Sequence, residues 1–327
     1  FSSWGPTDDG RIKPDIVANG QTLRSSIHTG DAAYGYASGT SMSTPSASGS
    51  INLLVRYFEA THDGLTPLSS TIKALLMHTA DEAGPDPGPD YMFGWGLMNT
   101  LKAAELILRD SVETRLIHEK ALADGELHEY ELESDGIEAI RIALAWTDPP
   151  GTSPPVSLNP ANLMLVNDLD LRLEHQTTAA VYEPYILDPA NPANAATTGD
   201  NFRDNCELIY LEAPPAGTYI VTVSHKGTLA TPQYYSLVGA QRLVDCDCTN
   251  FCDLDLNNAI DPLDVAILVA YVYQQLDARE QLLGCPLENG NWDCVGAVDP
   301  VDVAFYVAYV YQQVGDGPCD PCTFVAF

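Results

Sequence analysis

The pattern of hydrophobic and polar positions changes twice along the 327-residue chain. Residues 1 to about 110 hold a Gly/Ser-rich segment and three stretches that predict helices, at about 43–60, 70–80 and 99–108. Pro67 separates the first two, and the Pro/Gly loop "DEAGPDPGPD" between the last two cannot form regular structure. This part of the chain therefore predicts an α/β fold.

From about Ser111 the pattern changes to short strands divided by turn residues, as in "AIRIALAWTD", "NDLDLRLEH", "CELIYLEAP" and "GTYIVTVSHKG". In the last stretch, Tyr219, Val221 and Val223 fall on one face and the intervening residues on the other, which is the period of a half-buried strand. Strands repeated at such spacing predict a β-sandwich.

After Leu243 the chain contains an internal repeat. The stretch "DPLDVAILVAYVYQQ" at 261–275 returns as "DPVDVAFYVAYVYQQ" at 299–313 with three differences. Two copies of a loop followed by an apolar helix predict a paired unit in which each copy buries the hydrophobic face of the other.

Charge narrows the choice of partners. The chain has 15 Lys and Arg against 45 Asp and Glu, a net charge of −30, which repels nucleic-acid phosphate and anionic lipid. No apolar run approaches the roughly 18 residues of a membrane span. Many carboxylates fall at loop spacings that suit a hard cation, so Ca²⁺ is the expected counter-ion, although most of them serve equally well as a solubilising surface.

The chain begins at Phe1 without Met or a signal peptide, and we expect a longer precursor.

Seven of the eight cysteines crowd into the last quarter of the chain, where the predicted core is small. They are Cys246, Cys248, Cys252, Cys285, Cys294, Cys319 and Cys322. This crowding favours disulfides and an extracytoplasmic, oxidising location. A zinc site made by the first two and the last two is the alternative, weakened by the absence of two regular CxxC knuckles.

One serine has a setting that suits nucleophilic chemistry. In "ASGTSMSTPSASG", Ser41 precedes a predicted helix, so its backbone N–H and the positive end of the helix dipole would face a developing oxyanion. Gly39 allows close backbone approach, and Pro45 suits the first turn of a helix. The alternative is that Ser41 or Ser43 only caps the helix.

The string "GTSMSTP" resembles the nucleophile motif of the subtilisin-like serine proteases, the subtilases. "FSSWGPTDDGRIKPDIVANG" before it, and "IKALLMHTAD" and "FGWGLMN" after it, are similar to family segments in the same order over about 110 residues. Two positions depart from the family: Asn19 stands where Pro is usual, and Ser46 where His is frequent. The resemblance implies that Ser41 is the nucleophile of an Asp-His-Ser triad.

The Asp and His blocks that precede the serine in subtilases are absent from this sequence. His28 is the only histidine before Ser41 and is interpreted as a loop residue. His62 and His78 follow the serine, and we predict a surface residue and a packing residue respectively. A serine without a base retains only residual catalysis, so this chain alone is expected to be inactive.

Residues 113–243 resemble the jelly-roll domain that follows the catalytic domain in some subtilases, and more distantly the P-domain of proprotein convertases. The matching stretches include "IALAWTDPP", "LVNDLDLRL" and "YYSLVGA". The side chains of Asn167, Asp168, Asp170, Asp204 and Glu207 are candidate oxygen ligands for a structural calcium, or are turn-forming residues.

The repeat supplies oxygen ligands at the spacing of EF-hand loops. In the first copy they are Asp253, Asp255, Asn257, the Ala259 carbonyl, Asp261 and Asp264. In the second copy they are Asn291, Asp293, the Ala297 carbonyl, Asp299 and Asp302. Val295 replaces one ligand of the second copy, which predicts a weaker or empty site. The layout resembles type I dockerin domains, which bind cohesin modules of scaffolds or cell surfaces; a calcium-stapled stalk without a partner is the alternative.

The sequence thus predicts a multidomain protein: an α/β subtilase fragment at 1–112, a jelly-roll β-sandwich at 113–243 and a small dockerin-like helical module at 244–327. Its predicted function is that of a secreted, calcium-dependent serine endopeptidase acting on protein or peptide substrates, with a cohesin-like scaffold or cell-surface partner. A non-catalytic adhesion or scaffold-binding protein is the alternative. A polysaccharide-degrading enzyme ranks last, because no glycosidase-like carboxylate pair is recognisable.

Overall fold

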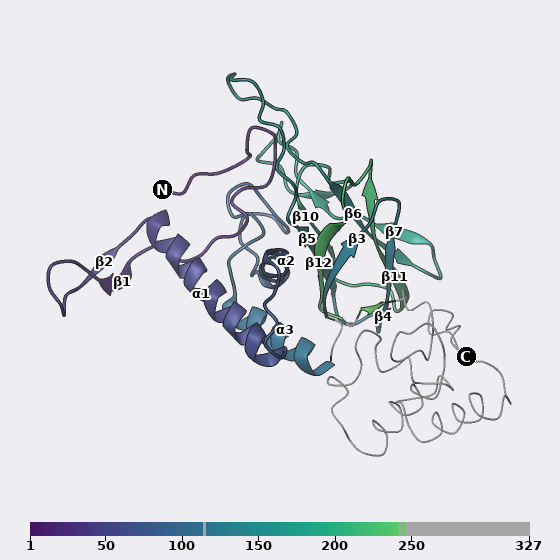
Figure 1. Ribbon diagram of the computed structural model, residues 1–327, viewed down its shortest axis with the longest axis horizontal. Helices are drawn as coiled ribbons and strands as arrows, with labels where there is room; N and C mark the ends of the chain where they lie inside the picture. Colours follow the sequence, from purple (N-terminus) through teal and green to yellow (C-terminus); the bar gives the residue numbers. More distant parts are fainter. Residues whose placement is uncertain (114–115, 242, 246–327) are drawn as a thin grey trace, which may run out of the picture. The chain divides into compact units, whose positions relative to one another are not determined.

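The computed structural model describes residues 1–113, 116–241 and 243–245, which combine a few helices with several antiparallel sheets (Figure 1). Residues Phe1–Val244 form one compact unit. The predicted boundary at 112/113 lies inside this unit, at the end of a helix, and stays a prediction. The cysteine-rich repeat, including every predicted EF-hand ligand, lies outside the described residues.

The first 113 residues contain the three expected helices, α1 (Thr40–Thr61), α2 (Ser69–Thr79) and α3 (Thr100–Glu113). They are preceded by a hairpin of β1 (Leu23–Ser26) and β2 (Tyr34–Ala37), which the sequence pattern did not predict. Among the described residues of this part, the other strand pairing consists of isolated bridges, one of them the parallel bridge Val17↔Leu97.

The second part contains the strands β3 (Ile117–Leu122), β4 (His128–Ser134), β5 (Ile140–Trp146), β6 (Asp168–His175), β7 (Ala180–Tyr182), β8 (Tyr185–Ile186), β9 (Thr197–Thr198), β10 (Cys206–Leu211), β11 (Gly217–Lys226), β12 (Gln233–Gly239) and β13 (Val244–Asp245). One sheet has the order β10-β5-β12-β3 and another the order β13-β4-β11-β6-β7. The four strands predicted from the quoted stretches are confirmed as β5, β6, β10 and β11.

Strand β5 shows how the two cores of the unit are divided. Ile142, Leu144 and Trp146 belong to the core between the two sheets. Ala143 and Ala145 point to the opposite face and belong to the core shared with the helices. Because successive side chains of a strand alternate between faces, small residues on one face let α2 approach the sheet while large residues fill the sandwich.

Helix α2 lies against β5 and β12 on one side and α3 on another. Nine of its eleven residues are buried, so it has almost no solvent-facing stripe. Its hydroxyls reach the sheet: Ser70 Oγ and Thr71 Oγ1 lie 2.7 and 2.8 Å from Ser236 Oγ on β12. Ser236 is fully buried, so these contacts satisfy polar groups that burial would otherwise penalise.

The alternation predicted for β11 is confirmed. Tyr219, Val221 and Val223 are fully buried in the sandwich core, and the residues between them are half-buried.

In the described part of the chain, no helix has both the length and the apolar character needed to cross a bilayer.

We expect Leu144→Ala to lower the free energy of unfolding by about 2–5 kcal/mol, because it opens a cavity between the sheets. Leu144 is fully buried, whereas Leu158 in the β5–β6 loop is 92 % exposed and makes the matched control. Urea unfolding followed by Trp fluorescence measures both. A Leu158→Ala variant destabilised as strongly as Leu144→Ala would contradict the assignment of the core.

Candidate functional site

Ser41 is the second residue of helix α1, and its side chain is exposed. The residue before the helix, Gly39, occupies the N-cap position and makes no side-chain capping bond. Ser43 instead donates its hydroxyl to the Ala18 carbonyl at 2.8 Å. The alternative interpretation of Ser41 or Ser43 as a helix cap is therefore wrong.

Two glycines hold the start of α1 against the segment before the hairpin. Gly39 has φ 151°, a conformation that residues with a Cβ rarely adopt, and its N–H donates to the Gly20 carbonyl at 2.8 Å. A Cβ at Gly20 would lie 2.7 Å from the Gly39 carbonyl oxygen and 2.9 Å from Ser43 Cβ. The close approach at Gly20 thus fixes where Ser41 sits.

Pro45 lies inside α1 rather than in its first turn, because the helix begins at Thr40, three residues earlier than predicted. Proline has no N–H to donate to the carbonyl four residues before it, which is that of Ser41. The Ser41 N–H is among the first N–H groups of the helix, which have no acceptor within the helix. The dipole of α1 adds partial positive charge at the same point.

No hydrogen bond to the Ser41 hydroxyl is found among the described residues. His28 lies exposed in the loop between β1 and β2, as predicted. His62 follows the other end of α1, about 30 Å from Ser41 at 1.5 Å per residue. Neither histidine is placed as a base for Ser41.

His62 is a structural residue, not the surface residue that was predicted. Its Nε2 lies 2.9 Å from Asp110 Oδ2 on α3, and its ring stacks on Phe58 with centroids 3.9 Å apart. Asp110 Oδ1 accepts hydrogen bonds from the Leu116 and Ile117 N–H groups. This pair therefore ties the ends of α1 and α3 to the start of β3.

His78 is the packing residue that was predicted. It is buried in α2, and its Nε2 donates to the Arg141 carbonyl at 2.9 Å. Burial, assisted by the nearby Arg141 charge, lowers the pKa of His78 to about 3, so its ring stays neutral.

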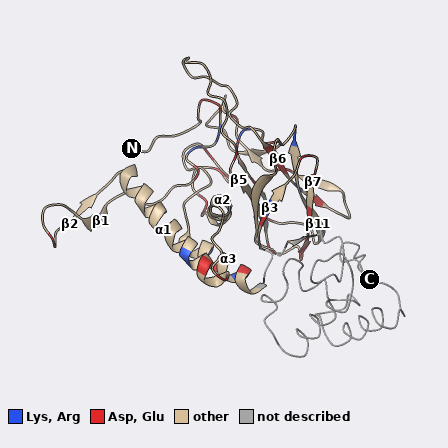
Figure 2. Cartoon of the chain, viewed as in Figure 1, with Lys and Arg blue, Asp and Glu red and all other residues tan. Residues whose placement is uncertain are grey.

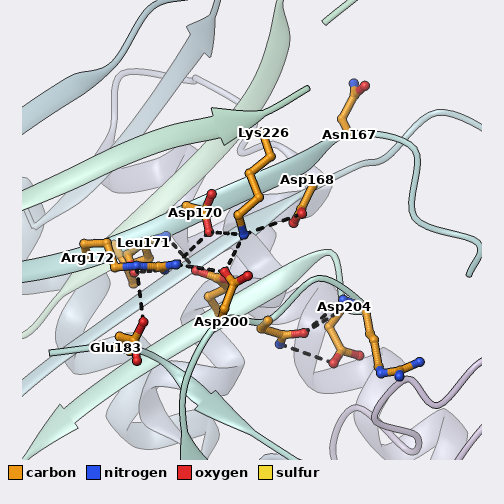
Figure 3. A network of polar contacts seen from close by, with 12 residues as sticks. Asn167, Asp168, Asp170, Leu171, Arg172, Glu183, Asp200, Asp204 and Lys226 are labelled. Carbon is orange, nitrogen blue, oxygen red and sulfur yellow. Dashed lines mark hydrogen bonds and ion pairs between the residues drawn. The ribbon is translucent and has the colours of Figure 1, made fainter. Parts of the chain in front are cut away.

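Two of the calcium candidates of the β part, Asp168 and Asp170, contact the ammonium group of Lys226 (Figure 3). Lys226 Nζ on β11 lies 2.8 Å from Asp170 Oδ1 and 3.7 Å from Asp168 Oδ2, and it also contacts Asp200. Arg172 Nη2 lies 2.9 Å from Asp170 and 2.8 Å from Asp200. Two protein cations thus neutralise these carboxylates.

The other candidates point to different partners. Asn167 donates to Gln233, Asp204 accepts the Ile12 N–H at 2.8 Å, and Glu207 accepts the Leu171 N–H at 2.6 Å. Within the described ranges, no group of three or more His, Cys, Asp or Glu side chains is placed to hold a metal ion.

Burial sets the protonation of this network. It raises the pKa of Asp168 to about 6 and that of Glu207 well above its ordinary value of 4.5. Burial alone would lower the pKa of Lys226, but its hydrogen bonds to Asp170 and Asp200 outweigh this and raise it. Glu207 is fully buried and one of its oxygens has no partner among the described residues, so the neutral acid is favoured.

The polar contacts that join the two parts of the unit could not be predicted from the sequence. Arg203 Nη1 donates to the Asp9 carbonyl at 2.7 Å, and Tyr91 donates to the Gly10 carbonyl. Lys73 on α2 reaches Asn205 at 2.8 Å and Asp15 at 3.2 Å. Residues 9–15 are therefore held by both parts, and the contact between Arg203 and Asp9 joins positions 194 residues apart in the sequence.

Comparison with known proteins agrees with the setting of Ser41. Residues 1–96 match the model of the subtilase family, Peptidase_S8. The chain is 27 % identical over 300 residues to "Serine protease/ABC transporter B family protein tagA" of Dictyostelium discoideum, covering 79 % of this chain and 16 % of that protein. It is 44 % identical over 82 residues to the C5a peptidase of Streptococcus pyogenes, covering 24 % of this chain and 7 % of that protein.

Residues 1–96 are thus similar to a segment of a subtilase domain, and two of the relatives bear the names of a serine protease and a peptidase. The chain spans only about a sixth or less of the length of these relatives.

The raised pKa of Glu207 generates a prediction on stability. The folded state holds the Glu207 proton more tightly than the unfolded chain does. The contribution of this group to the free energy of unfolding is therefore complete below about pH 4.5, the ordinary pKa of a glutamate. As pH rises toward the folded pKa, that contribution falls by at most about 1.4 kcal/mol per pH unit. Glu207→Gln keeps the acceptor for Leu171 but does not titrate. Its stability relative to wild type should therefore rise with pH, as measured by urea unfolding between pH 5 and 8.

The matched control is Glu129→Gln, which removes an exposed carboxylate from β4. The same pH-dependent gain in both variants would show that burial of Glu207 is not the cause.

Proposed function

We propose that this chain is part of a secreted, subtilisin-like serine endopeptidase in which Ser41 is the nucleophile. The observation that carries the proposal is an exposed serine hydroxyl at the positive end of α1, held there by Gly20 and Gly39, inside the segment that matches the subtilase family. The triad Asp and His and the oxyanion Asn are proposed to come from polypeptide on the N-terminal side of Phe1.

The geometry suits acyl transfer. A base takes the Ser41 proton as Oγ bonds to the carbonyl carbon of a peptide, and the carbonyl oxygen becomes an oxyanion. The Ser41 N–H and the α1 dipole offer stabilisation to that charge. Collapse of the intermediate breaks the C–N bond as the base returns the proton to the leaving amine, and water then releases the acyl group.

The exposed apolar side chains of this part of the chain support the proposal that it belongs to a larger catalytic domain. Leu53 on α1 is 66 % exposed, and Tyr36 on β2 and Trp4 are 71 % and 66 % exposed. Large exposed apolar side chains are typical of surfaces that pack against further protein.

For residues 113–243 we propose a jelly-roll domain that stabilises the peptidase segment. Successive strands β3, β4, β5 and β6 alternate between the two sheets, and β10, β11 and β12 return beside them in reverse. This is the order that two Greek-key motifs produce in a jelly roll. The burial of α2 against β5 and β12 supports the stabilising role.

For residues 244–327 we propose a calcium-binding, dockerin-like module that attaches the enzyme to a cohesin-like scaffold or a cell surface. Support comes from the spacing of oxygen-bearing residues in the first copy of the repeat, Asp253 to Asp264, and from the duplication of the apolar stretch that follows them in the sequence. A non-catalytic adhesion protein with the same module remains the second candidate. Asp and His triad blocks encoded upstream of Phe1 favour the enzyme, and a complete gene without them favours the adhesion protein.

In the full-length protein, a fluorophosphonate probe should label Ser41, because the base and the oxyanion donors activate only that hydroxyl. Mass spectrometry of the labelled peptide is the measurement. Ser43→Ala is the matched control: it removes the neighbouring hydroxyl that bonds Ala18 and should leave labelling in place. Undiminished labelling of Ser41→Ala would sink the proposal.

Calcium titration of the 327-residue chain by calorimetry should reveal one tight site. Asp255→Ala should abolish it by removing a ligand of the first loop, whereas Val295→Asp should add a second tight site by restoring the missing ligand of the second loop. Two equally tight sites in the wild-type chain would contradict the interpretation of Val295.

A further inference from the structure

Asn19 and Gly20 form an Asn-Gly pair in the segment that packs against the start of α1. Asn19 is exposed, and it stands where the similar subtilase segments usually have Pro. Glycine has no side chain to shield its backbone nitrogen, so this nitrogen can approach the asparagine amide closely. The pair therefore carries a chemical reactivity that a proline at position 19 would lack.

The side chain of Asn19 is folded back onto the peptide that follows it. Its Oδ1 accepts the Gln21 N–H at 3.0 Å, which closes a ring that contains Asn19 Cγ and the Gly20 nitrogen. The same donor polarises the side-chain carbonyl and stabilises negative charge that develops on Oδ1. No acceptor for the Gly20 N–H is found among the described residues, so no hydrogen bond opposes its deprotonation.

The backbone on both sides of Asn19 is tied to the start of α1. Three hydrogen bonds of 2.8 Å run from Ser43 Oγ to the Ala18 carbonyl, from the Gly39 N–H to the Gly20 carbonyl and from the Thr22 N–H to Ser38 Oγ. Because these bonds lie on both sides of Asn19, their relative positions depend on the length of backbone at that residue. Ser41 lies within the segment that they hold, so its position depends on the same length.

We propose that Asn19 deamidates through the backbone nitrogen of Gly20, and that the isoaspartyl product displaces Ser41. The Gly20 nitrogen loses its proton and bonds to Asn19 Cγ, and the bond from Cγ to the side-chain nitrogen breaks. The side-chain nitrogen takes up the proton and leaves as ammonia, and a cyclic imide remains. Water then opens the imide at either carbonyl, which leaves an aspartate or an isoaspartate at position 19.

The isoaspartate carries the main chain through its Cβ and Cγ, so the backbone gains one CH₂ between the tied positions. The segment cannot absorb it by moving closer to α1, because even a Cβ on Gly20 would lie 2.7 Å from the Gly39 carbonyl oxygen. We therefore expect the hydrogen bond from Gly39 to Gly20 to weaken and Ser41 to leave its position. The modification is independent of the proposed function, whereas the loss of peptidase activity with age rests on Ser41 being the nucleophile.

The test incubates the 327-residue chain near pH 8, where a backbone N–H deprotonates faster than at lower pH, and maps its peptides by mass spectrometry. The peptide with Asn19 should deamidate, with isoaspartate resolved from aspartate by fragmentation. Mapping also separates it from a second Asn-Gly pair, Asn289–Gly290, which lies outside the described residues.

Two variants identify the nucleophile. Asn19→Gln should slow deamidation at this position at least about tenfold, because its longer side chain must close a larger ring. Asn159→Gln is the matched control and should leave deamidation of Asn19 unchanged. Asn159 is equally exposed but precedes Pro160, which has no N–H to lose.

Hydrogen exchange of the ¹⁵N-labelled chain reports on the position of Ser41. The Gly39 N–H should exchange about fivefold to tenfold faster in the isoaspartyl form, as expected for the loss of one hydrogen bond. Freshly prepared Asn19→Asp adds the charge without lengthening the backbone, and should keep the exchange rate of the unmodified chain. In the full-length protein, fluorophosphonate labelling of Ser41 should fall as the isoaspartate content rises.

The proposal is overturned if Asn19 stays intact in the folded chain while it deamidates in the urea-unfolded chain. It is also overturned if the isoaspartyl form keeps the Gly39 exchange rate of the fresh chain. Fresh full-length protein in which Ser41 is never labelled would instead reject Ser41 as the nucleophile, and the peptide map and the exchange rate would still decide the modification.

Discussion

The burial of helix α2 on nearly all sides is the constraint on which the described unit depends. A helix with almost no exposed stripe must be enclosed by other elements, and here α3 and the outer face of the four-stranded sheet enclose it. The sheet accepts it because β5 presents Ala143 and Ala145 on that face, while the hydroxyl of Ser236 pairs with those of Ser70 and Thr71 in the first turn of α2.

The packing of the unit also determines which charged groups are buried and how they are neutralised. Figure 2 marks Asp and Glu in red along the described chain, on the helices as well as in the strand-rich part. Two buried carboxylates illustrate how burial is accommodated: Asp170 meets Lys226 and Arg172, and the raised pKa of the fully buried Glu207 favours its neutral form. The network resembles the ligand set of a bound cation, but a lysine ammonium provides the charge.

Much of the fold was predictable from the sequence, because it depends on local patterns. The helices around Ser41 and His78 and the alternation of Tyr219, Val221 and Val223 follow from residue spacing alone. The contacts that were missed are long-range: Arg203 to Asp9, Lys73 to Asn205 and His62 to Asp110 join positions whose sequence context is unremarkable in composition. The setting of Ser41 was predictable because a short motif encodes it, whereas the start of α1 was not, since Gly39 rather than a polar side chain occupies the cap.

The shared core of α2 and β5 has an evolutionary consequence. Recombination at the 112/113 junction would leave one product with a bare helix and the other with an unprotected sheet face. The two segments should therefore have been inherited together, and relatives that carry a different module after the peptidase segment would need a substitute cover for the same helix.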